Sequence, residues 1–247
     1  MLPKSFAATG YHATPVMHDI ARFHVLGERS SGTNFVKRLM GRNTPLKPTE
    51  ALGWKHAFMH MRAVPKDLAV ICVVRSADAW ARSMHAKPWH TTPALQKLPF
   101  SEFIRAEWDT IVDRPRYFDD LDKQTLGQPL QYDRNPATGA RFENIFALRT
   151  AKLRSLISML NRDCACVLLR MEDATKDPEN TLLHLRTSLG LPMSTQEFRP
   201  VVKRLGSKFK PSVETRPDTP DAMSSDDLAH LKASVDSDLE AALGYTY

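Results

Sequence analysis

The chain lacks any long hydrophobic stretch. Its longest uninterrupted apolar run, Leu68 to Val74, covers seven of the 247 residues, whereas about 20 are needed to span a bilayer. The first twelve residues (MLPKSFAATGYH) contain no apolar segment typical of a secretory signal. We therefore expect neither a signal peptide nor stable insertion into a membrane.

Cysteine is scarce as well. The three cysteines, Cys72, Cys164 and Cys166, all lie within apolar stretches. An odd number without the paired spacing of a zinc site indicates neither a disulfide framework nor a structural metal. The expectation is a cytoplasmic protein with reduced thiols and no metal cofactor.

Long blocks of like charge are also missing. Lys and Arg number 34 and Asp and Glu 28, which gives a formal net charge of +6. Such an excess fits an anionic partner, for example a phosphorylated small ligand, an anionic surface or a nucleic acid. Nucleic-acid binding usually needs aromatic residues interleaved with basic ones along one face. No such stripe occurs, so no nucleic acid is expected as a partner.

Short apolar stretches alternate with amphipathic ones along the chain. Strands are predicted at residues 23–26, 69–74 and 164–169, each apolar enough to be buried on both faces of a parallel sheet. Helices are predicted at 34–40, 77–86, 101–112 and 142–160, from Pro178 to Gly190, and from about Ser225 to Gly244. This alternation indicates an α/β fold, a single domain with a central parallel β-sheet flanked by helices.

Three segments fall outside this alternation. Residues 1–20 form an N-terminal extension, and residues 113–141 mix Pro, Gly and Asp with Tyr and Phe without a steady period. Loops of that length are often lids or binding segments, so we expect a lid or substrate loop there. Residues 204–224 form a Pro-rich basic loop. No linker-like stretch divides the chain, and one domain over residues 1–247 is the prediction.

A loop of small residues follows the first predicted strand. Its sequence, Gly27-Glu28-Arg29-Ser30-Ser31-Gly32-Thr33-Asn34, leads into a predicted helix. Backbone N–H groups in such a loop bind anions, and a helix N-terminus adds partial positive charge. The spacing matches a nucleotide-binding P-loop, but Thr33 stands where a nucleoside triphosphatase has lysine. The sequence therefore predicts an anion site that is poorly suited to ATP hydrolysis.

A second basic feature ends the next buried strand. Val73-Val74-Arg75 is followed, eight residues after the arginine, by Ser83. Ligands of open α/β sheets bind at the carboxyl ends of the strands, so Arg75 is expected near the loop 27–34. Arginine forms charge-assisted hydrogen bonds to phosphate, and a serine hydroxyl can add one more. Arg75 and Ser83 are therefore predicted to share a phosphate subsite.

Together these motifs resemble the family of sulfotransferases that use 3'-phosphoadenosine 5'-phosphosulfate (PAPS). The segments GERSSGTN (27–34) and VVRSADAWARS (73–83) are similar to the loop that grips the 5'-phosphosulfate and the strand end that grips the 3'-phosphate. Further similar segments are Arg170–Asp173, Asp177–Glu179, Leu189–Leu191 and Leu243–Tyr245. The resemblance implies a P-loop sulfotransferase fold, PAPS as donor with adenosine 3',5'-bisphosphate as product, and sulfuryl transfer to an acceptor hydroxyl or amine.

The resemblance also implies which residues hold the donor. They are Arg29, Ser30, Ser31, Gly32, Thr33, Asn34, Arg75 and Ser83, with a basic segment at Lys208 and Lys210 closing over the 3'-phosphate. The usual loop lysine of the family falls at Ser30 in this chain. A cation near the bridging oxygen should stabilise charge on the leaving phosphate. Arg29, Lys37 and Lys55 remain alternatives for that cation.

Transfer to a hydroxyl also needs a base, and histidine suits this because its pKa lies near neutrality. His56, in Trp54-Lys55-His56, occupies the position that the family commonly gives to its basic histidine. The resemblance therefore implies His56 as the general base and Lys55 as a supporting charge. His60 and Glu50 are the alternatives. The acceptor is expected to be a small molecule, a lipid or a carbohydrate.

Two other functions fit parts of the pattern. A P-loop kinase-like nucleotide-dependent transferase would need a lysine after Gly32 and an acidic residue after an apolar strand, but the stretch Cys164–Leu169 is followed by Arg170. A non-enzymatic basic domain that binds nucleotide or nucleic acid fits the net charge alone. The sulfotransferase hypothesis accounts for both anion motifs.

Overall fold

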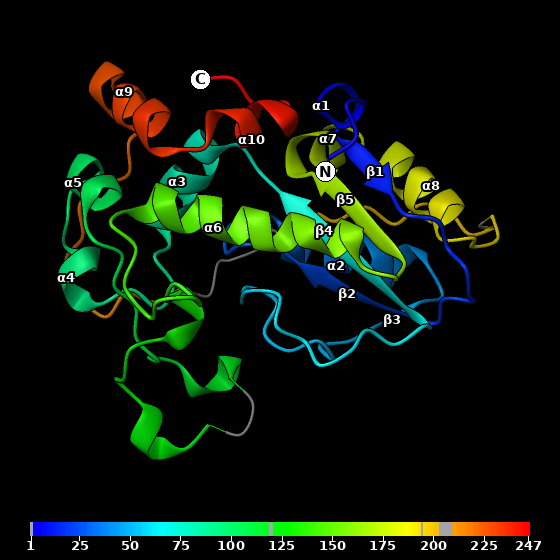
Figure 1. Cartoon of the computed structure of the whole chain (residues 1–247), viewed down its shortest axis with the longest axis horizontal. Helices are drawn as coiled ribbons and strands as arrows, with labels where there is room; N and C mark the ends of the chain where they lie inside the picture. Colours follow the sequence, from blue (N-terminus) through cyan, green and yellow to red (C-terminus); the bar gives the residue numbers. More distant parts are fainter. Residues whose placement is uncertain (1, 119–120, 194, 203–208) are drawn as a thin grey trace. The chain divides into compact units, whose positions relative to one another are not determined.

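The computed structural model describes residues 2–118, 121–193, 195–202 and 209–247 (Figure 1). The chain forms two compact units. Unit 1 comprises Met1–Arg75, Lys152–Leu205 and Asp238–Thr246, and unit 2 comprises Ser76–Ala151, Gly206–Ser237 and Tyr247. The division follows no linker in the sequence, because each unit is assembled from separate stretches of chain.

Unit 1 contains a five-stranded sheet with the order β1-β5-β4-β2-β3. Its strands are β1 (Tyr11–Ala13), β2 (Arg22–Leu26), β3 (Lys47–Pro48), β4 (Leu68–Val74) and β5 (Cys166–Arg170). Strand β4 pairs in parallel with β2 and β5, and β2 pairs in parallel with β3 (Figure 1). The mostly parallel sheet with flanking helices confirms the predicted α/β fold.

Burial explains why the central strands could be found in the sequence. All seven residues of β4 are buried, as expected of a strand covered on both faces. Odd-numbered side chains of the three central strands share one core with α2 (Thr33–Asn43) and α8 (Pro178–Ser188). The members of this core include Phe23, Val25, Val36, Met40, Ala69, Ile71, Val73, Val167, Leu169, Leu182 and Leu185.

The N-terminal segment 1–20, expected to be an extension of the domain, contains regular secondary structure. It contains a short helix, α1 (Phe6–Thr9), and strand β1, which pairs antiparallel with β5 in the register Tyr11↔Leu169. The central strands are parallel as predicted, and β1 adds an antiparallel strand at this edge. A three-residue strand is too short to show the two-residue alternation that sequence patterns depend on.

Two further elements of unit 1 follow β5. Helix α7 (Met171–Lys176) leads to Asp177, whose carboxylate accepts a hydrogen bond of 3.1 Å from the N–H of Asn180. Asp177 therefore caps α8, and Pro178 fills the first helical position as the sequence predicts. Gly190 follows this helix with a φ of 65°.

Unit 2 is helical in the part that the structure describes. It contains α3 (Ala77–Ala86), α4 (Pro93–Gln96), α5 (Phe100–Arg105), α9 (Ser225–Ser234) and the start of α6 (Ile145–Ile157). Helix α6 begins where Asn144 accepts two hydrogen bonds of 2.9 Å from the N–H groups of Phe146 and Ala147. From Lys152 onward its residues belong to unit 1, and a 3₁₀ turn, Ser158–Asn161, continues it.

Two predicted helices are corrected. The helix predicted at 101–112 ends at Arg105, because the N–H groups of Trp108 and Val112 donate instead to the carbonyls of Phe142 and Gln128. These bonds hold residues 106–112 extended. The helix predicted from Ser225 is interrupted at Val235, whose ψ of 159° is extended, and α10 (Ser237–Ala242) follows as a separate element.

The predicted lid at 113–141 contains three 3₁₀ turns, Pro115–Tyr117, Lys123–Thr125 and Gln131–Asp133. Residues 204–208 of the predicted basic loop lie outside the described residues. Within the described parts of the chain, no helix combines the length and apolar character needed to cross a bilayer. The same residues contain no group of three or more His, Cys, Asp or Glu side chains able to hold a metal ion.

Candidate functional site

The loop 27–34 connects β2 to α2 and adopts a backbone conformation that sequence reasoning could only anticipate. Ser30 and Gly32 have φ angles of 62° and 99°, in the left-handed region. The φ of Gly32 strains any residue with a Cβ, and a Cβ there would also meet the flexible side chain of Met171, so the position favours glycine. Alternating right- and left-handed residues turn successive N–H groups toward one side, which forms a concavity for an anion.

Several donors of this loop are available. The N–H of Ser31 donates to the carbonyl of Glu28 over 3.1 Å, which closes the turn. The N–H groups of Gly32, Thr33 and Asn34, by contrast, donate to no other residue that the structure describes. The hydroxyl of Ser31 is buried without a hydrogen-bond partner in the same described part of the chain. These donors fit a phosphate or sulfate group.

A buried ion network lies directly beside the loop. The Glu28 carboxylate accepts from the N–H and the Nε of Arg29 at 2.7 and 3.1 Å, and its second oxygen lies 3.1 Å from Lys152 Nζ. The side chains of Glu28, Arg29 and Lys152 are only 6%, 2% and 5% exposed. Glu28 has no recognisable role in the sequence, because its partner Lys152 lies far along the chain.

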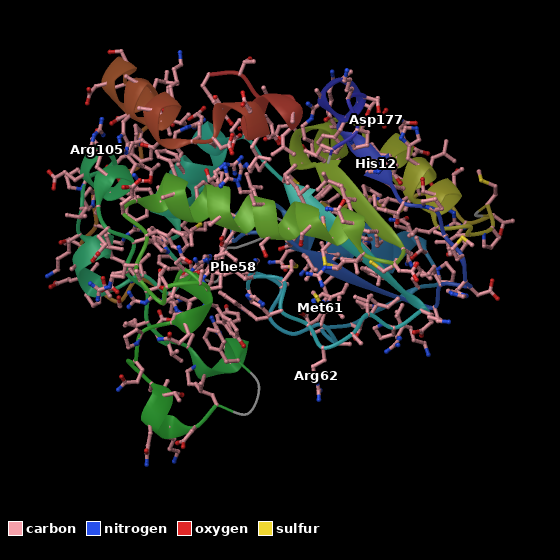
Figure 2. The ribbon with its side chains drawn as sticks, in the orientation of Figure 1. His12, Phe58, Met61, Arg62, Arg105 and Asp177 are labelled. Atoms are coloured by element: carbon pink, nitrogen blue, oxygen red, sulfur yellow. The ribbon has the colours of Figure 1, made fainter. Side chains whose placement is uncertain are left out.

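Aromatic rings surround the cations of this network. The guanidinium carbon of Arg29 lies 5.7 Å from the ring centroid of Trp54, and Lys152 Nζ lies 5.8 Å from the same centroid. Lys152 Nζ is also 5.6 Å from the ring centroid of Phe58, which is labelled in Figure 2. The rings exclude water from the cations and attract them through their negative faces.

Lys55 and Lys37, the other two cations considered for the leaving phosphate, differ in their partners. Lys37 Nζ pairs with Glu50 at 2.5 Å. Lys55 Nζ instead donates to the neutral side-chain amide of Asn34, in the first turn of α2, at 2.7 Å. Burial lowers the pKa of Lys55, while Glu50 raises it and Lys37 lowers it. The ammonium of Lys55 is therefore held at the loop without a directly bound carboxylate among the described residues.

His56 is fixed to the first residue of the loop. Its Nδ1 lies 2.6 Å from the carbonyl oxygen of Gly27. A carbonyl can only accept, so Nδ1 carries the proton and Nε2 of the neutral ring keeps its lone pair. Lys152 Nζ donates to the His56 carbonyl at 2.8 Å, and the N–H of Gly27 donates to the Lys55 carbonyl at 3.0 Å. Residues 55 and 56 are thus fastened to the loop.

The environment of His56 keeps its ring neutral. Burial lowers the pKa of His56 well below its ordinary value, the charge of Lys55 lowers it further, and the hydrogen bond to Gly27 opposes both. A neutral imidazole with one unshared electron pair can accept a proton. The ring also meets Trp54 edge to face, with centroids 5.2 Å apart.

The alternative bases are less suited. His60 is exposed. Burial acts to raise the pKa of Glu50, but hydrogen bonds from His24 and Lys37 and the charge of Lys37 outweigh it and lower that pKa to about 2. Both oxygens of the Glu50 carboxylate are already occupied, one by Lys37 and the other by His24. His24, which the sequence analysis did not consider, is buried with Nε2 3.3 Å from Glu50.

Arg75 lies at the loop, as expected from its place at the end of β4. Its Nη1 donates to the carbonyl of Ser30 over 3.0 Å. Ser83, on α3, and the exposed Lys210 belong to unit 2. Their participation in a site with Arg75 stays a prediction. Lys208 lies outside the described residues.

Comparisons of the chain with protein-family models, curated proteins and solved structures gave no match. The resemblance to sulfotransferases therefore depends on the sequence motifs alone.

Proposed function

We propose that the chain is a PAPS-dependent sulfotransferase, which moves a sulfuryl group to an acceptor hydroxyl or amine. The observation that carries this proposal is the hydrogen bond between His56 Nδ1 and Gly27 O, 2.6 Å long. It attaches a neutral imidazole to the first residue of a loop whose later amides are available to an anion. A proton acceptor and an anion cradle are thereby held in one rigid element.

The residues of the loop fit the phosphosulfate end of the donor. The N–H groups of Gly32, Thr33 and Asn34 and the buried hydroxyl of Ser31 supply hydrogen bonds to its oxygens. When bound, PAPS supplies an activated sulfuryl group attached to a phosphate. The absence of a lysine after Gly32 is consistent with a donor other than a nucleoside triphosphate.

Proton transfer is assigned to His56. Its Nε2 accepts the proton of the acceptor hydroxyl while the Nδ1–H remains on the carbonyl of Gly27. Because burial and the charge of Lys55 keep the pKa of His56 low, the ring is unprotonated and competent at neutral pH. Burial and the charge of Lys55 also destabilise the imidazolium, which favours release of the proton.

Cations of unit 1 stabilise the negative charge that develops on the leaving phosphate. Arg29, Lys55 and Lys152 place three positive charges at the loop, beside the buried carboxylate of Glu28. Fixed cations in a partly dry environment stabilise a developing anion more strongly than water does. Lys55, which has no directly bound carboxylate in the described part of the chain, is the cation that we assign to this role.

The proposal includes a cytoplasmic location, since Cys72, Cys164 and Cys166 are free thiols. A small molecule, lipid or carbohydrate is the acceptor, and residues 113–141 are proposed to select it. Ser83 and the basic residue Lys208 are proposed to hold the 3'-phosphate together with Arg75.

Nucleotide binding tests the donor. Adenosine 3',5'-bisphosphate at 100 times its Kd should stabilise the fold by about 2.7 kcal/mol, on the order of 5–10 °C in Tm for a chain of this size. AMP should give a much smaller shift because it lacks the 3'-phosphate. Equal shifts from the two nucleotides would contradict the donor assignment.

Label transfer tests the reaction. Incubation with sulfur-35-labelled PAPS and a library of phenols, sterols, lipids and saccharides should label at least one acceptor, and the His56→Ala variant should label it far more slowly. Transfer of the γ-phosphate from labelled ATP, with none from PAPS, would replace the proposal by a kinase-like function.

A further inference from the structure

Unit 2 contains a basic pocket of its own. It has a volume of about 490 Å³ and is lined by Asp113, Arg114, Arg116, Lys210 and Ser212. Residues from the predicted lid and from the predicted basic loop therefore meet in one place. Three of the five side chains are cationic, and one is a carboxylate.

Arg114 is held rigidly at this pocket. Its Nε donates to Asp113 Oδ2 at 2.9 Å and its Nη2 to the carbonyl of Lys210 at 2.7 Å. The guanidinium carbon lies 5.0 Å from the ring centroids of both Trp89 and Phe209. Two hydrogen bonds and two rings fix the group before any ligand arrives, so little conformational entropy is lost on binding.

The one carboxylate of the pocket is already engaged. Asp113 Oδ1 lies 2.7 Å from His90 Nδ1, while Oδ2 accepts from Arg114. His90 is buried and has a φ of 67°, a left-handed conformation that a non-glycine residue adopts only under strain. Strain of this kind persists only where the surroundings impose it, which here are Asp113 and the rings of Tyr117 and Phe118.

The remaining donors are available to a ligand. Among the described residues, the ammonium of Lys210 and the hydroxyl of Ser212 have no hydrogen-bond partner, and both residues are exposed. Arg116 uses one nitrogen, Nη2, to reach the hydroxyl of Tyr117 at 2.9 Å. With the charge of Asp113 engaged by Arg114, the positive charges of Arg116 and Lys210 are left unbalanced at the pocket.

We propose that this pocket binds a doubly charged tetrahedral oxyanion, the phosphate of a phosphorylated small molecule or free phosphate. A phosphate presents oxygens on every side to the Arg116 guanidinium, the Lys210 ammonium and the Ser212 hydroxyl around the fixed Arg114. Its two charges match the two unbalanced cations, which a carboxylate would only half neutralise. The inference assigns Lys210 a role within unit 2 and does not depend on the sulfotransferase proposal.

The Trp89 indole provides a direct readout, since its ring lies against Arg114. The indole N–H resonance of nitrogen-15-labelled protein, assigned through its loss in Trp89→Phe, is followed while inorganic phosphate is added at pH 8. A saturable shift is expected. Arg116→Gln/Lys210→Gln, which alters two exposed side chains, should weaken the binding at least tenfold, because each lost charge-assisted bond contributes roughly that factor.

A charge-matched control is available in the same unit. Lys97→Gln/Lys232→Gln also removes two exposed cations of unit 2 and should leave phosphate affinity within about threefold of wild type. Phenyl phosphate distinguishes the two sources of the anion: tighter binding than inorganic phosphate supports an esterified ligand, and equal binding supports free phosphate. Benzoate binding as tightly as phosphate would overturn the proposal, as would a Trp89 resonance that phosphate leaves unchanged.

Failure of this inference and failure of the proposed function give different results. A Trp89 shift with phosphate, in a protein that adenosine 3',5'-bisphosphate does not stabilise, supports the pocket and contradicts the donor assignment. Stabilisation by the bisphosphate, together with a Trp89 resonance that phosphate leaves unchanged, supports the donor assignment and contradicts the pocket.

Discussion

Glu28 of unit 1 and Asp113 of unit 2 are two carboxylates that each hold two basic side chains, in very different surroundings. Glu28 pairs with Arg29 and Lys152, and all three side chains are 6% exposed or less. Asp113 pairs with His90 and Arg114, and both Asp113 and Arg114 are 13% exposed. The first cluster is almost dry, whereas the second borders a pocket.

The comparison shows two ways in which a protein can hold positive charge next to an anion site. At Glu28 the ions depend on one another, because a buried charge without its partner is strongly unfavourable. At Asp113 the guanidinium has a carbonyl and two rings as further support. Substitutions in the cluster of Glu28, Arg29 and Lys152 should therefore lower both activity and stability. Substitutions in the cluster of Asp113, His90 and Arg114 should affect anion binding with little loss of stability.

The largest effect is expected for His56, the proposed general base. His56→Ala should retain the fold and most of the nucleotide affinity but reduce kcat by about 10²–10⁴, the usual contribution of general-base catalysis. Steady-state sulfuryl transfer measures this. His60→Ala and Glu50→Gln are the controls and should stay within about tenfold of wild type. Near-normal turnover of His56→Ala would move the role of base to one of them.

The pH dependence of kcat sharpens the same assignment. Burial keeps the pKa of His56 below its ordinary value, so the ring remains an active base through pH ~6.5, where a free histidine is half protonated. The rate should fall only at lower pH, as Nε2 becomes protonated. His56→Ala should lose this acidic limb. A limb that persists in the variant would assign the titration to another group.

Glu28→Gln tests the dependence of the buried ions on one another. It leaves Arg29 and Lys152 without their carboxylate and should lower the free energy of unfolding by about 3–5 kcal/mol. Denaturant unfolding monitors this, with the exposed Glu197→Gln of the same unit as control. A loss under about 1 kcal/mol would show that the cluster is more hydrated than its burial suggests.

Arg75→Ala tests the anion site at the end of β4. Removing its charged donor should weaken adenosine 3',5'-bisphosphate by about 1.5–3 kcal/mol, and Ser83→Ala by about 0.5–1.5 kcal/mol. Calorimetric titration gives both values. Arg62, which Figure 2 shows directed away from the ribbon, provides the matched control Arg62→Ala. Unchanged affinity in Arg75→Ala would mean that Arg75 only braces the carbonyl of Ser30.

The smallest effect is expected for Asp113→Asn. Arg114 keeps its hydrogen bond to Lys210 and its two rings, so the free energy of unfolding should fall by only about 1–2 kcal/mol. Phosphate binding at the pocket should persist or strengthen, because a negative charge has been removed. A loss of stability as large as that of Glu28→Gln would erase the distinction between the two clusters.

The sequence could predict the elements whose patterns are local. Strands β2, β4 and β5 were found to within two residues because each is an apolar run, and α3 matches the predicted 77–86. Spacing misled at Ile104, Trp108 and Ile111, which fit a helix but lie partly in an extended segment. Hydrogen bonds to residues 128 and 142 decide that conformation, and no local pattern reports them.

In the candidate site, too, the features with a local sequence pattern could be predicted and those that depend on tertiary packing could not. The loop 27–34 and Arg75 could be predicted because glycine spacing and strand ends are visible in sequence. The pairing of Glu28 with Lys152 and the attachment of His56 to Gly27 could not, since both depend on tertiary packing. The neighbours of Lys210 in the pocket could not be predicted either, because they come from a segment about a hundred residues away.

The amide resonances of Gly32, Thr33 and Asn34 test the central claim most directly, namely that the loop is the donor's anion site. Their N–H groups have no partner among the described residues, so a bound phosphate should shift them strongly downfield. Titration of nitrogen-15-labelled protein with adenosine 3',5'-bisphosphate should move all three together, with a single Kd, and AMP should do so only at higher concentration. Resonances that stay in place while the nucleotide binds elsewhere would contradict the account.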